Sequence, residues 1–429
     1  MKTSANGILL LYDFPLVWKD ANTILEHVSS FEDHSRHKVW SLNVKAGFPK
    51  NLSKYEFNVI VLHYSLFGSN EYPFDSQFLE LLKSHSASYK IAFFQDEYRF
   101  CQKRFNFINE FGIQCVYSCL SSPDLETVYR PNTRAKTLLS VVPGFVSDTM
   151  IQLGTKYSVP LEKRNIDIAY RGRALEPYMG KAALEKTEIA DQFLNEAKRN
   201  NINDLKLDLH TREDRRLYGE TWYRFLGNTK AVLGVESGVS LFDLDGQVFE
   251  LYSHLKKRHS RSITYDELRS TNPDLIDSRE NTVHYRTISP RHFEAASTRT
   301  CQILFEGEYS GILKPMIHYL PLMKDFSNFL EIVRMFRDTQ LTNKIVTRAY
   351  SDLIKSGNYH YNAFINTFDE IVSPHLLKRD FGSENEISRT IDADAFWRIG
   401  LKKLKLIHRF DFPGRKRLGR IKRYLTRVQ

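Results

Sequence analysis

Three residues with acidic or basic side chains stand at the ends of apolar, β-branched segments of the sequence. Asp96 and His63 end or follow two such segments in the first hundred residues, and Glu236 follows another one further along the chain. A carboxylate or an imidazole at the end of a strand can act as a general base, and a glutamate can also act as a nucleophile. Asp96, Glu236 and His63 are therefore the catalytic candidates, although a single histidine at a strand end is more often structural.

A basic turn near the middle of the chain has the composition of a phosphate site. Arg171, Gly172 and Arg173 follow the apolar segment 166–170. The glycine lets backbone amides approach an anion closely, and each guanidinium offers a planar fork of donors to phosphate oxygens. The turn predicts a diphosphate site, and the alternative is an ordinary solvated turn.

Two further short motifs lie between residues 237 and 246. Ser237 and Gly238 follow an apolar segment and can hold the hydroxyls of a sugar or a ribose. Asp243 and Asp245 have the spacing of a carboxylate pair that holds Mn²⁺ or Mg²⁺, ions that prefer oxygen ligands. Because this pair stands directly before Gly246, a turn is the better interpretation, and we expect no metal and no bound cofactor.

Alternating strands and helices must position these residues. Apolar, β-branched segments recur through the first 150 residues, and between most of them apolar residues recur every three or four positions, as in amphipathic helices. The predicted strands are 8–12, 38–42, 59–63, 89–94, 115–117 and 137–142, and the predicted helices are 22–30, 76–84 and 100–111. This alternation is typical of a doubly wound, largely parallel sheet, whose functional loops lie at the carboxyl ends of the strands.

A second α/β unit begins where the strand pattern restarts, at 166–170, and it continues with a strand at 231–235. From residue 326 onward the pattern is helical. We therefore predict a first domain over 1–150, a second domain over 151–375, a helical return segment over 376–397 and a separate tail over 398–429.

The positive charge of the chain is concentrated in this tail. The 429 residues carry a formal net charge of +10, yet residues 398–429 alone hold twelve Lys and Arg and only one Asp. The rest of the chain is close to neutral, which argues against a fold built around a polyanion. In 401–410 apolar and basic residues alternate, a pattern typical of segments that bind anionic membranes, at roughly 1 kcal/mol per Lys or Arg. A solvated tail and a tail that binds nucleic acid are the alternatives.

Several classes of protein are disfavoured by what the sequence lacks. It contains no G-x-x-x-x-G-K-[ST], G-x-G-x-x-G, G-x-S-x-G or H-E-x-x-H motif, which argues against P-loop, dinucleotide-binding, α/β-hydrolase and zincin chemistry. Cys115 and Cys119 form a Cys-x3-Cys pair without a second pair, so we expect reduced thiols rather than a zinc site. The apolar stretch 8–12 is too short for a membrane span or a signal peptide, and a cytoplasmic location is expected.

About forty residues carry a resemblance to a known family. The segment 289–311, SPRHFEAASTRTCQILFEGEYSG, and the segment 318–328, HYLPLMKDFSN, resemble the donor-site signature of GT-B glycosyltransferases. They are most similar to the bacterial family 1-like members of lipopolysaccharide and capsule assembly. In that signature an Arg-x-Phe-Glu-Ala helix start is followed by an apolar stretch, a sugar-binding loop, a Pro-Leu strand and an Asp-x-x-Asn helix start. Segments 95–98, 166–173 and 222–246 also look like stretches of this family, in the expected order.

The resemblance implies a fold and a set of binding residues. GT-B enzymes have two Rossmann-like domains that face each other across a cleft, and their final helices cross back to the N-terminal domain. The C-terminal domain mainly holds the nucleotide sugar, and the N-terminal domain holds the acceptor. Glu294 is then the glutamate that binds the donor ribose. With the candidates named above, the expected donor-binding set is Arg171, Gly172, Arg173, Ser237, Gly238, Arg291 and Glu294.

One departure from the family pattern affects the mechanism. Many retaining members carry two glutamates eight residues apart, but eight residues before Glu294 this chain has Arg286. Glu236 is a candidate substitute, with residues 247–288 inserted between the two halves of the motif. If the enzyme retains configuration, Glu236 is the candidate nucleophile or a contact on the reacting face.

An inverting enzyme needs a base for the acceptor hydroxyl instead. Asp96 is then favoured over Glu97 and His63, because acidic strand-end residues of the N-terminal domain face the acceptor in the family. Negative charge also builds on the leaving phosphate, and Arg171 and Arg173 are the candidates that stabilise it in place of a metal. The sequence leaves both stereochemical outcomes open.

The resemblance implies a glycosyltransferase that moves a sugar from a nucleotide-sugar donor to a lipid-linked or polysaccharide acceptor in bacterial surface glycan (O-antigen or capsule) biosynthesis. With its basic tail, such an enzyme is expected on the inner face of the cytoplasmic membrane as a peripheral protein, without a nucleic acid partner. Because the glutamate pair is broken, a catalytically silent nucleotide- or sugar-binding subunit of a glycan assembly complex is an alternative. A nucleic-acid-binding protein that relies on the tail is another.

Overall fold

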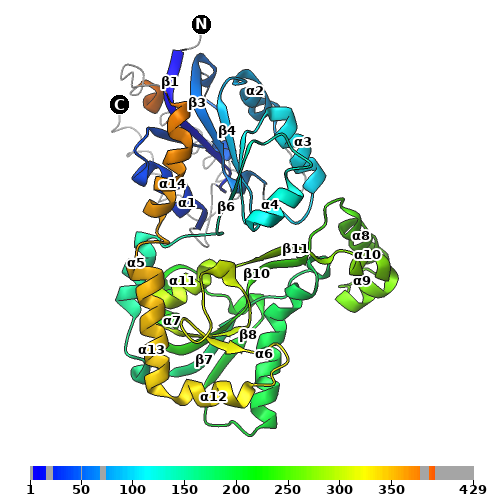
Figure 1. Ribbon diagram of the computed structural model, residues 1–429, viewed down its shortest axis with the longest axis vertical. Helices are drawn as coiled ribbons and strands as arrows, with labels where there is room; N and C mark the ends of the chain where they lie inside the picture. The colour runs from blue at the N-terminus through cyan, green and yellow to red at the C-terminus, as the bar shows by residue number, and fades with distance from the viewer. Residues whose placement is uncertain (1–2, 16–22, 50, 68–73, 377–385, 392–429) are drawn as a thin grey trace, which may run out of the picture.

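The computed structural model describes residues 3–15, 23–49, 51–67, 74–376 and 386–391, which form two α/β domains (Figure 1). The first domain is built on a six-stranded parallel sheet in the order β2-β1-β3-β4-β5-β6. Its strands are β1 (Thr3–Tyr12), β2 (Val39–Asn43), β3 (Tyr55–Leu62), β4 (Tyr89–Phe93), β5 (Cys115–Ser118) and β6 (Thr137–Ser140). Its helices are α1 (Thr23–His34), α2 (Ser76–Ser84), α3 (Cys101–Phe111) and α4 (Ser122–Val128). All six predicted strands and three predicted helices of this part are confirmed.

The first sheet is apolar on both faces, as a parallel sheet covered by helices on both sides must be. Along β1, Leu9 and Leu11 point into one buried cluster, while Ile8 and Leu10 point into the other. A strand with this pattern reads as a continuous apolar run, which is why the sequence identified it.

The second domain has a five-stranded parallel sheet in the order β13-β12-β9-β7-β8. Its strands are β7 (Ile166–Arg171), β8 (Leu207–His210), β9 (Thr229–Gly234), β12 (Cys301–Phe305) and β13 (Leu320–Leu322). The helices around it are α5 (Asp148–Tyr157), α6 (Lys181–Arg199), α7 (Gly219–Gly227), α11 (Pro290–Ser297), α12 (Phe329–Arg337) and α13 (Thr339–Ala349). The strand order reverses between β1 and β3 in the first sheet and between β7 and β9 in the second. At such switch points the loops diverge and leave a crevice for a ligand.

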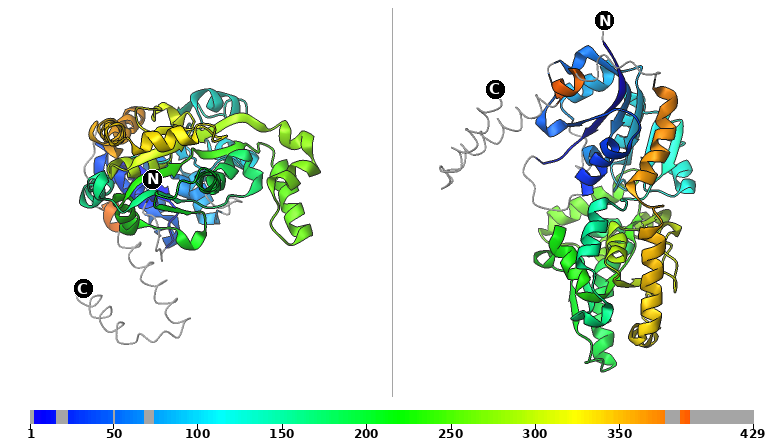
Figure 2. Two further views of the ribbon diagram at one scale, coloured as in Figure 1. Left: turned by 90° about the horizontal axis from the view of Figure 1, so that it is seen from below. Right: turned by 90° about the vertical axis from the view of Figure 1, so that its left-hand side faces the viewer.

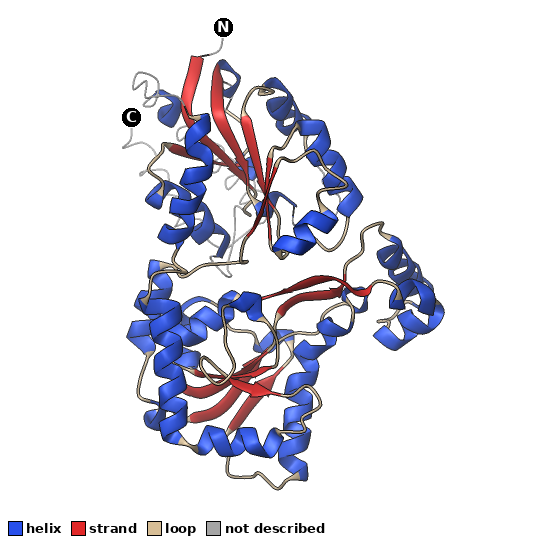
Figure 3. Ribbon diagram, viewed as in Figure 1, coloured by secondary structure: helices blue, strands red, loops and turns tan. Residues whose placement is uncertain are grey.

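The second domain carries a hairpin arm, which includes nearly all of the insertion expected at 247–288; its hairpin form was not predicted. The antiparallel strands β10 (Ser237–Leu241) and β11 (Glu280–Thr287) carry three helices at their far end (Figure 3). These helices are α8 (Gln247–His259), α9 (Tyr265–Thr271) and α10 (Pro273–Asp277). We call residues 237–287 the arm. It contacts the first domain, where the backbone N–H of Asp243 donates to the carbonyl oxygen of Tyr98 at 2.9 Å.

The chain crosses between the domains twice. After α13 it returns to the first domain as α14 (Tyr361–Val372), which lies against that domain (Figure 2). Phe364 and Phe368 of α14 pack on the first sheet. At the crossing, the backbone N–H of Val146 donates to the carbonyl of Tyr359 at 2.8 Å, which ties the two connecting segments together. The two Rossmann-like domains and the helical C-terminal part expected for a GT-B fold are therefore present.

The return to the first domain thus begins at α14, inside the range predicted for the second domain. Within the predicted return segment, residues 386–391 are helical, and Ser388 accepts a hydrogen bond from Trp40 Nε1 at 3.0 Å. The predicted tail, 398–429, lies outside the described residues. No described helix is long and apolar enough to cross a membrane.

Candidate functional site

A cleft of about 900 Å³ separates the two domains. From the first domain, Asp13 and Asp96 line it just beyond the carboxyl ends of β1 and β4. From the second domain, Arg173 lines it just beyond β7, and Pro290 lines it at the start of α11. The carboxyl ends of both sheets therefore meet at this cleft, as expected for open α/β sheets.

A second pocket of about 210 Å³ opens into the second domain at its switch point, at the ends of β7 and β9. Arg173 lines both this pocket and the interdomain cleft, so the two spaces adjoin. Five of the seven predicted donor-binding residues line the pocket, namely Arg171, Gly172, Arg173, Ser237 and Arg291. We call it the donor pocket.

The other two predicted donor residues lie beside the donor pocket. Glu294 accepts a hydrogen bond of 2.7 Å from Nε1 of Trp222, which does line the pocket, so this carboxylate lies one side chain away. Gly238 has φ +111°, and a Cβ atom on it would lie 1.9 Å from the carbonyl oxygen of Tyr285. A glycine is therefore required at this position because β10 and β11 approach each other closely, so Gly238 has a structural role.

Three cations around the donor pocket form no ion pair with a carboxylate among the described residues: Arg173, Lys186 and Arg291. Burial lowers the pKa of Lys186 to about 8, and the positive charges of Arg291 and Arg173 contribute, while Asp96 opposes the shift. Lys186 and Arg291 are half-buried and Arg173 is exposed. A group of neighbouring cations that repel one another is a site suited to an anion.

Arg171 differs from Arg173 in a way that the sequence did not reveal. Its buried guanidinium forms an ion pair of 2.8 Å with Asp208 on β8 and also donates to the carbonyl oxygens of Tyr170 and Asp208. It lies 4.3 Å from the centre of the Phe225 ring. The charge of Arg171 is thus paired with Asp208, whereas Arg173 has no carboxylate partner among the described residues. Both arginines line the donor pocket, and their role in donor binding stays a prediction.

Asp96 is exposed to the cleft, opposite the donor pocket. Its backbone has φ +54°, a left-handed conformation that few residues other than glycine adopt, and the hydroxyl of Tyr285 on the arm accepts its N–H at 2.9 Å. The protein atoms around its carboxyl group exclude water and thereby raise its pKa, while the positive charges of Lys186, Arg99 and Arg173 oppose this shift. Local backbone strain of this kind concentrates at functional sites.

The two residues weighed against Asp96 as the base are both fully buried. Glu97 accepts hydrogen bonds from the hydroxyls of Ser118 and Tyr129 and supports the first domain from inside. His63 contacts Nδ1 of His27 through its Nε2 at 2.9 Å, and burial lowers its pKa well below the ordinary value. His63 is therefore a core residue, which corrects its prediction as a catalytic base.

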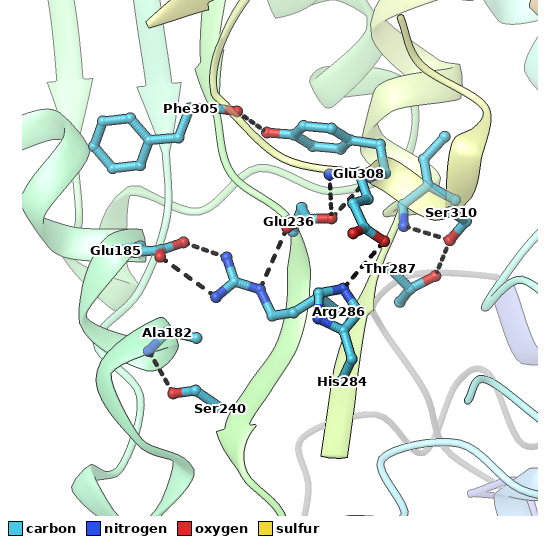
Figure 4. Close-up of polar contacts among 12 residues, drawn as sticks. Ala182, Glu185, Glu236, Ser240, His284, Arg286, Thr287, Phe305, Glu308 and Ser310 are labelled. Carbon is cyan, nitrogen blue, oxygen red and sulfur yellow. Dashed lines mark hydrogen bonds and ion pairs between the residues drawn. The ribbon is translucent and has the colours of Figure 1, made fainter. Parts of the chain in front are cut away.

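Glu236 stands in the chain between Val235 and Ser237, which line the donor pocket, and its side chain belongs to a polar network (Figure 4). Its carboxylate accepts the backbone N–H groups of Glu308 and Tyr309 at 3.1 and 2.7 Å, and its other oxygen lies 3.5 Å from Nε of Arg286. Arg286 also forms an ion pair with Glu185 on α6.

This network changes the interpretation of the broken glutamate pair. Glu236 is 5 % exposed, and its carboxylate is engaged by the loop after β12 and by Arg286. It anchors that loop and compensates the charge of Arg286, the arginine that stands where many retaining members have a glutamate. Such a carboxylate is a positioning group, which argues against the prediction of Glu236 as a nucleophile.

The acidic pair before α8 has a local role. The carboxylate of Asp243 accepts the backbone N–H groups of Val248 and Phe249, and Asp245 accepts that of Gln247. These bonds satisfy the first donors of the helix. The predicted turn is thus confirmed, and the described part of the chain holds no cluster of three metal-ligating side chains.

Sequence reasoning missed Lys186 and Tyr285, which join the two halves of the site. Lys186 lies within α6, and Tyr285 lies on the arm. The candidate residues were chosen because they follow apolar strands. Lys186 and Tyr285 do not follow such a strand, so they were not identified. The only signal was that α6 begins shortly after the Arg171–Arg173 turn.

No family model matches the sequence, and no curated protein matches it. Solved structures with similarity include TarM (TM-score 0.40, 11% identity, 75% of this chain and 55% of TarM). Another is sucrose-phosphate synthase from Thermosynechococcus elongatus (TM-score 0.46, 11% identity, 86% of this chain and 98% of the synthase). A third is Anabaena HepE in complex with UDP and glucose (TM-score 0.44, 11% identity, 86% of this chain and 100% of HepE). The chain spans about half the length of TarM and nearly all of the other two. With these scores, the matches carry no conclusion about substrate.

Proposed function

We propose that the protein is a GT-B glycosyltransferase that uses a nucleotide-sugar donor. The observation that carries this proposal is the group of Arg173, Lys186 and Arg291, which lines the donor pocket and lacks a carboxylate partner among the described residues. Arg173 also lines the interdomain cleft together with Asp96, which interacts electrostatically with Lys186. A diphosphate supplies the two or three negative charges that this group requires. Asp96, a carboxylate on the first domain, supplies the general base that sugar transfer also needs.

The distribution of charge around the pocket supports one orientation of the donor. Its diphosphate lies at Arg173 and Lys186, where the pocket joins the cleft, so that the sugar reaches toward Asp96. The nucleoside then extends along Arg291 and Trp222, and Glu294 behind Trp222 is the proposed partner of the ribose. In this orientation the negatively charged diphosphate lies at the positively charged mouth of the pocket, and the nucleoside lies along the aromatic wall.

Asp96 is the proposed general base. It accepts the proton of the acceptor hydroxyl while that oxygen attacks the anomeric carbon, and the bond from this carbon to the diphosphate oxygen breaks. Arg173 and Lys186 stabilise the charge that builds on the leaving diphosphate. Because Glu236 is held by Arg286 and the backbone, we propose direct displacement with inversion rather than a covalent intermediate.

The acceptor and the location rest on the sequence. We propose a lipid-linked or polysaccharide acceptor in bacterial surface glycan (O-antigen or capsule) biosynthesis, and a tail that holds the enzyme on the inner membrane face. What supports this is the resemblance of 289–328 together with the basic, amphipathic pattern of 398–429.

The test is a nucleotide panel measured by thermal shift. UDP, GDP, dTDP and CMP are each added in excess to the wild type and to Lys186→Met, and Lys198→Met, an exposed lysine on the same helix, is the matched control. At 100 times its dissociation constant a nucleotide stabilises the folded state by about 2.7 kcal/mol. The proposal expects one nucleotide to stabilise the wild type and the control but not Lys186→Met. It fails if none of the four does so.

A further inference from the structure

The interdomain cleft continues past Asp96 onto the arm. Arg99, Glu176 and Tyr178 line the cleft, and the same three residues line a second hollow of about 400 Å³ that runs along α8. Phe249 and Lys257 of α8 form the far side of this hollow. We call it the arm groove. The interdomain cleft and the arm groove are thus adjacent hollows that share three lining residues.

Three aromatic residues line the arm groove, namely Tyr178, Phe249 and Tyr252. The ring of Phe249 packs against Tyr178, with centroids 5.1 Å apart, and against Phe100 at 5.3 Å. The guanidinium of Arg99 lies 5.5 Å from the Phe249 centroid and donates to the hydroxyl of Tyr178 at 2.9 Å. The C–H face of a sugar ring is apolar and its edge carries hydroxyls, so a group of rings with polar edges suits a glycan.

The rim of the arm groove carries a surplus of positive charge. Glu176 is the only acid that lines it among the described residues, and this carboxylate already accepts the hydroxyl of Tyr252 and pairs with Lys256 at 3.3 Å. Lys257 is exposed on the rim, and its side chain has no hydrogen-bond or ion-pair partner in the described part of the chain. With Arg99 on the opposite wall, the groove is complementary to a carboxylate or phosphate.

We propose that the arm groove is an acceptor subsite for an acidic glycan. The hydroxyl that reacts lies at Asp96, and sugar units beyond it continue past Arg99 onto α8, where carboxylate or phosphate substituents lie at Lys257. This inference rests on the proposed function and adds to it the substrate class: an extended, negatively charged oligosaccharide rather than a single neutral sugar.

Two variants on adjacent residues of α8 test this inference in the full chain. Lys257→Glu reverses a charge on the groove, and Arg258→Glu reverses the same charge on an exposed neighbour that does not line it. Binding of hexagalacturonate, which carries a carboxylate on every unit, and of neutral maltohexaose is measured by calorimetry at low salt. Because residues 398–429 are themselves basic and can bind polyanions, the difference between the two variants is the informative quantity.

We expect Lys257→Glu to weaken hexagalacturonate binding about fivefold to tenfold relative to Arg258→Glu, and maltohexaose to bind more weakly than hexagalacturonate. Ser253→Trp, which fills the groove without changing its charge, is expected to weaken binding as well. Equal effects of the two charge reversals, or equal binding of the neutral hexasaccharide, would overturn the proposal.

The nucleotide panel separates this inference from the proposed function. Lys257→Glu is expected to keep the nucleotide response of the wild type, because Lys257 does not line the donor pocket. If the wild type responds to a nucleotide but the variants at 257 and 258 bind the acidic glycan equally, only the acceptor assignment fails. If no nucleotide stabilises the wild type, the glycosyltransferase proposal itself fails.

Discussion

Tyr285 holds Asp96 across the domain boundary: its hydroxyl accepts the backbone N–H of Asp96 at 2.9 Å. Tyr285 belongs to β11 of the second domain, whereas Asp96 follows β4 of the first. The proposed base is therefore positioned by the same domain that carries the donor pocket. This contact couples the orientation of Asp96 to the approach of the two domains.

Tyr285→Phe should slow sugar transfer without weakening nucleotide binding. The substitution removes the acceptor of the Asp96 N–H, and the loss of a typical hydrogen bond costs about 0.5–1.5 kcal/mol. We expect kcat to fall about tenfold while the affinity for the nucleotide stays constant. Tyr265→Phe, which removes a hydroxyl bonded to Glu280 elsewhere on the arm, is the matched control. An unchanged kcat in Tyr285→Phe would argue against the positioning role.

Nucleotide affinity should decline as the pH rises through about 8. The pKa of Lys186 is lowered to about 8, so its ammonium is present below this pH and is lost above it. The charged form attracts the diphosphate, and the affinity is expected to drop about fivefold between pH 7 and pH 9. Calorimetry at both pH values measures the effect. Lys186→Met should lack this decline, and an identical decline in the variant would show that another group is responsible.

Arg286→Met should destabilise the second domain strongly. It leaves the carboxylates of Glu185 and Glu236 without their common partner, and removing one member of a buried ion pair costs roughly 3–5 kcal/mol. Thermal unfolding should shift downward by several degrees. Arg337→Met removes an exposed ion pair with Asp204 and should change stability by less than about 1 kcal/mol. Similar shifts in the two variants would refute a structural role for the Arg286 network.

Deletion of residues 398–429 should abolish binding to anionic vesicles. The segment carries twelve Lys and Arg, and each residue near the surface contributes about 1 kcal/mol. Co-sedimentation with vesicles containing anionic lipid, compared with neutral vesicles, measures the effect. Nucleotide binding should remain, because the donor pocket is formed by the second domain. Equal sedimentation of the full and shortened chains would remove the basis for a membrane-bound enzyme.

The sequence predicted the parts of this fold whose signal is local. Buried parallel strands such as β1 are continuous apolar runs, and Asp96 could be proposed because it follows one of them. The Arg173 turn was found in the same way. These residues depend on their immediate neighbours in the chain, so their types and order are sufficient to identify them.

The remaining features depend on contacts between distant residues. The burial of His63 is decided by His27 and the core around it, and the neutralised charge of Arg171 is decided by Asp208 on another strand. Arg286 meets Glu185 across 101 positions of sequence. Neither hydrophobic periodicity nor motif spacing identifies such pairs. For this reason the sequence did not predict that Arg171 is paired with a carboxylate while Arg173 is not.

Asp96→Asn provides the most direct test of the proposed transfer reaction. The amide keeps the size and polarity of the carboxylate but cannot accept the proton of the acceptor hydroxyl, and loss of a general base lowers rates by roughly 10²–10⁴-fold. The measurement is the transfer of labelled sugar from the nucleotide sugar identified by the panel to glycan acceptors in a membrane extract. We predict that Asp96→Asn binds the nucleotide as the wild type does and loses transfer by at least a hundredfold. Transfer at the rate of the wild type would contradict the account.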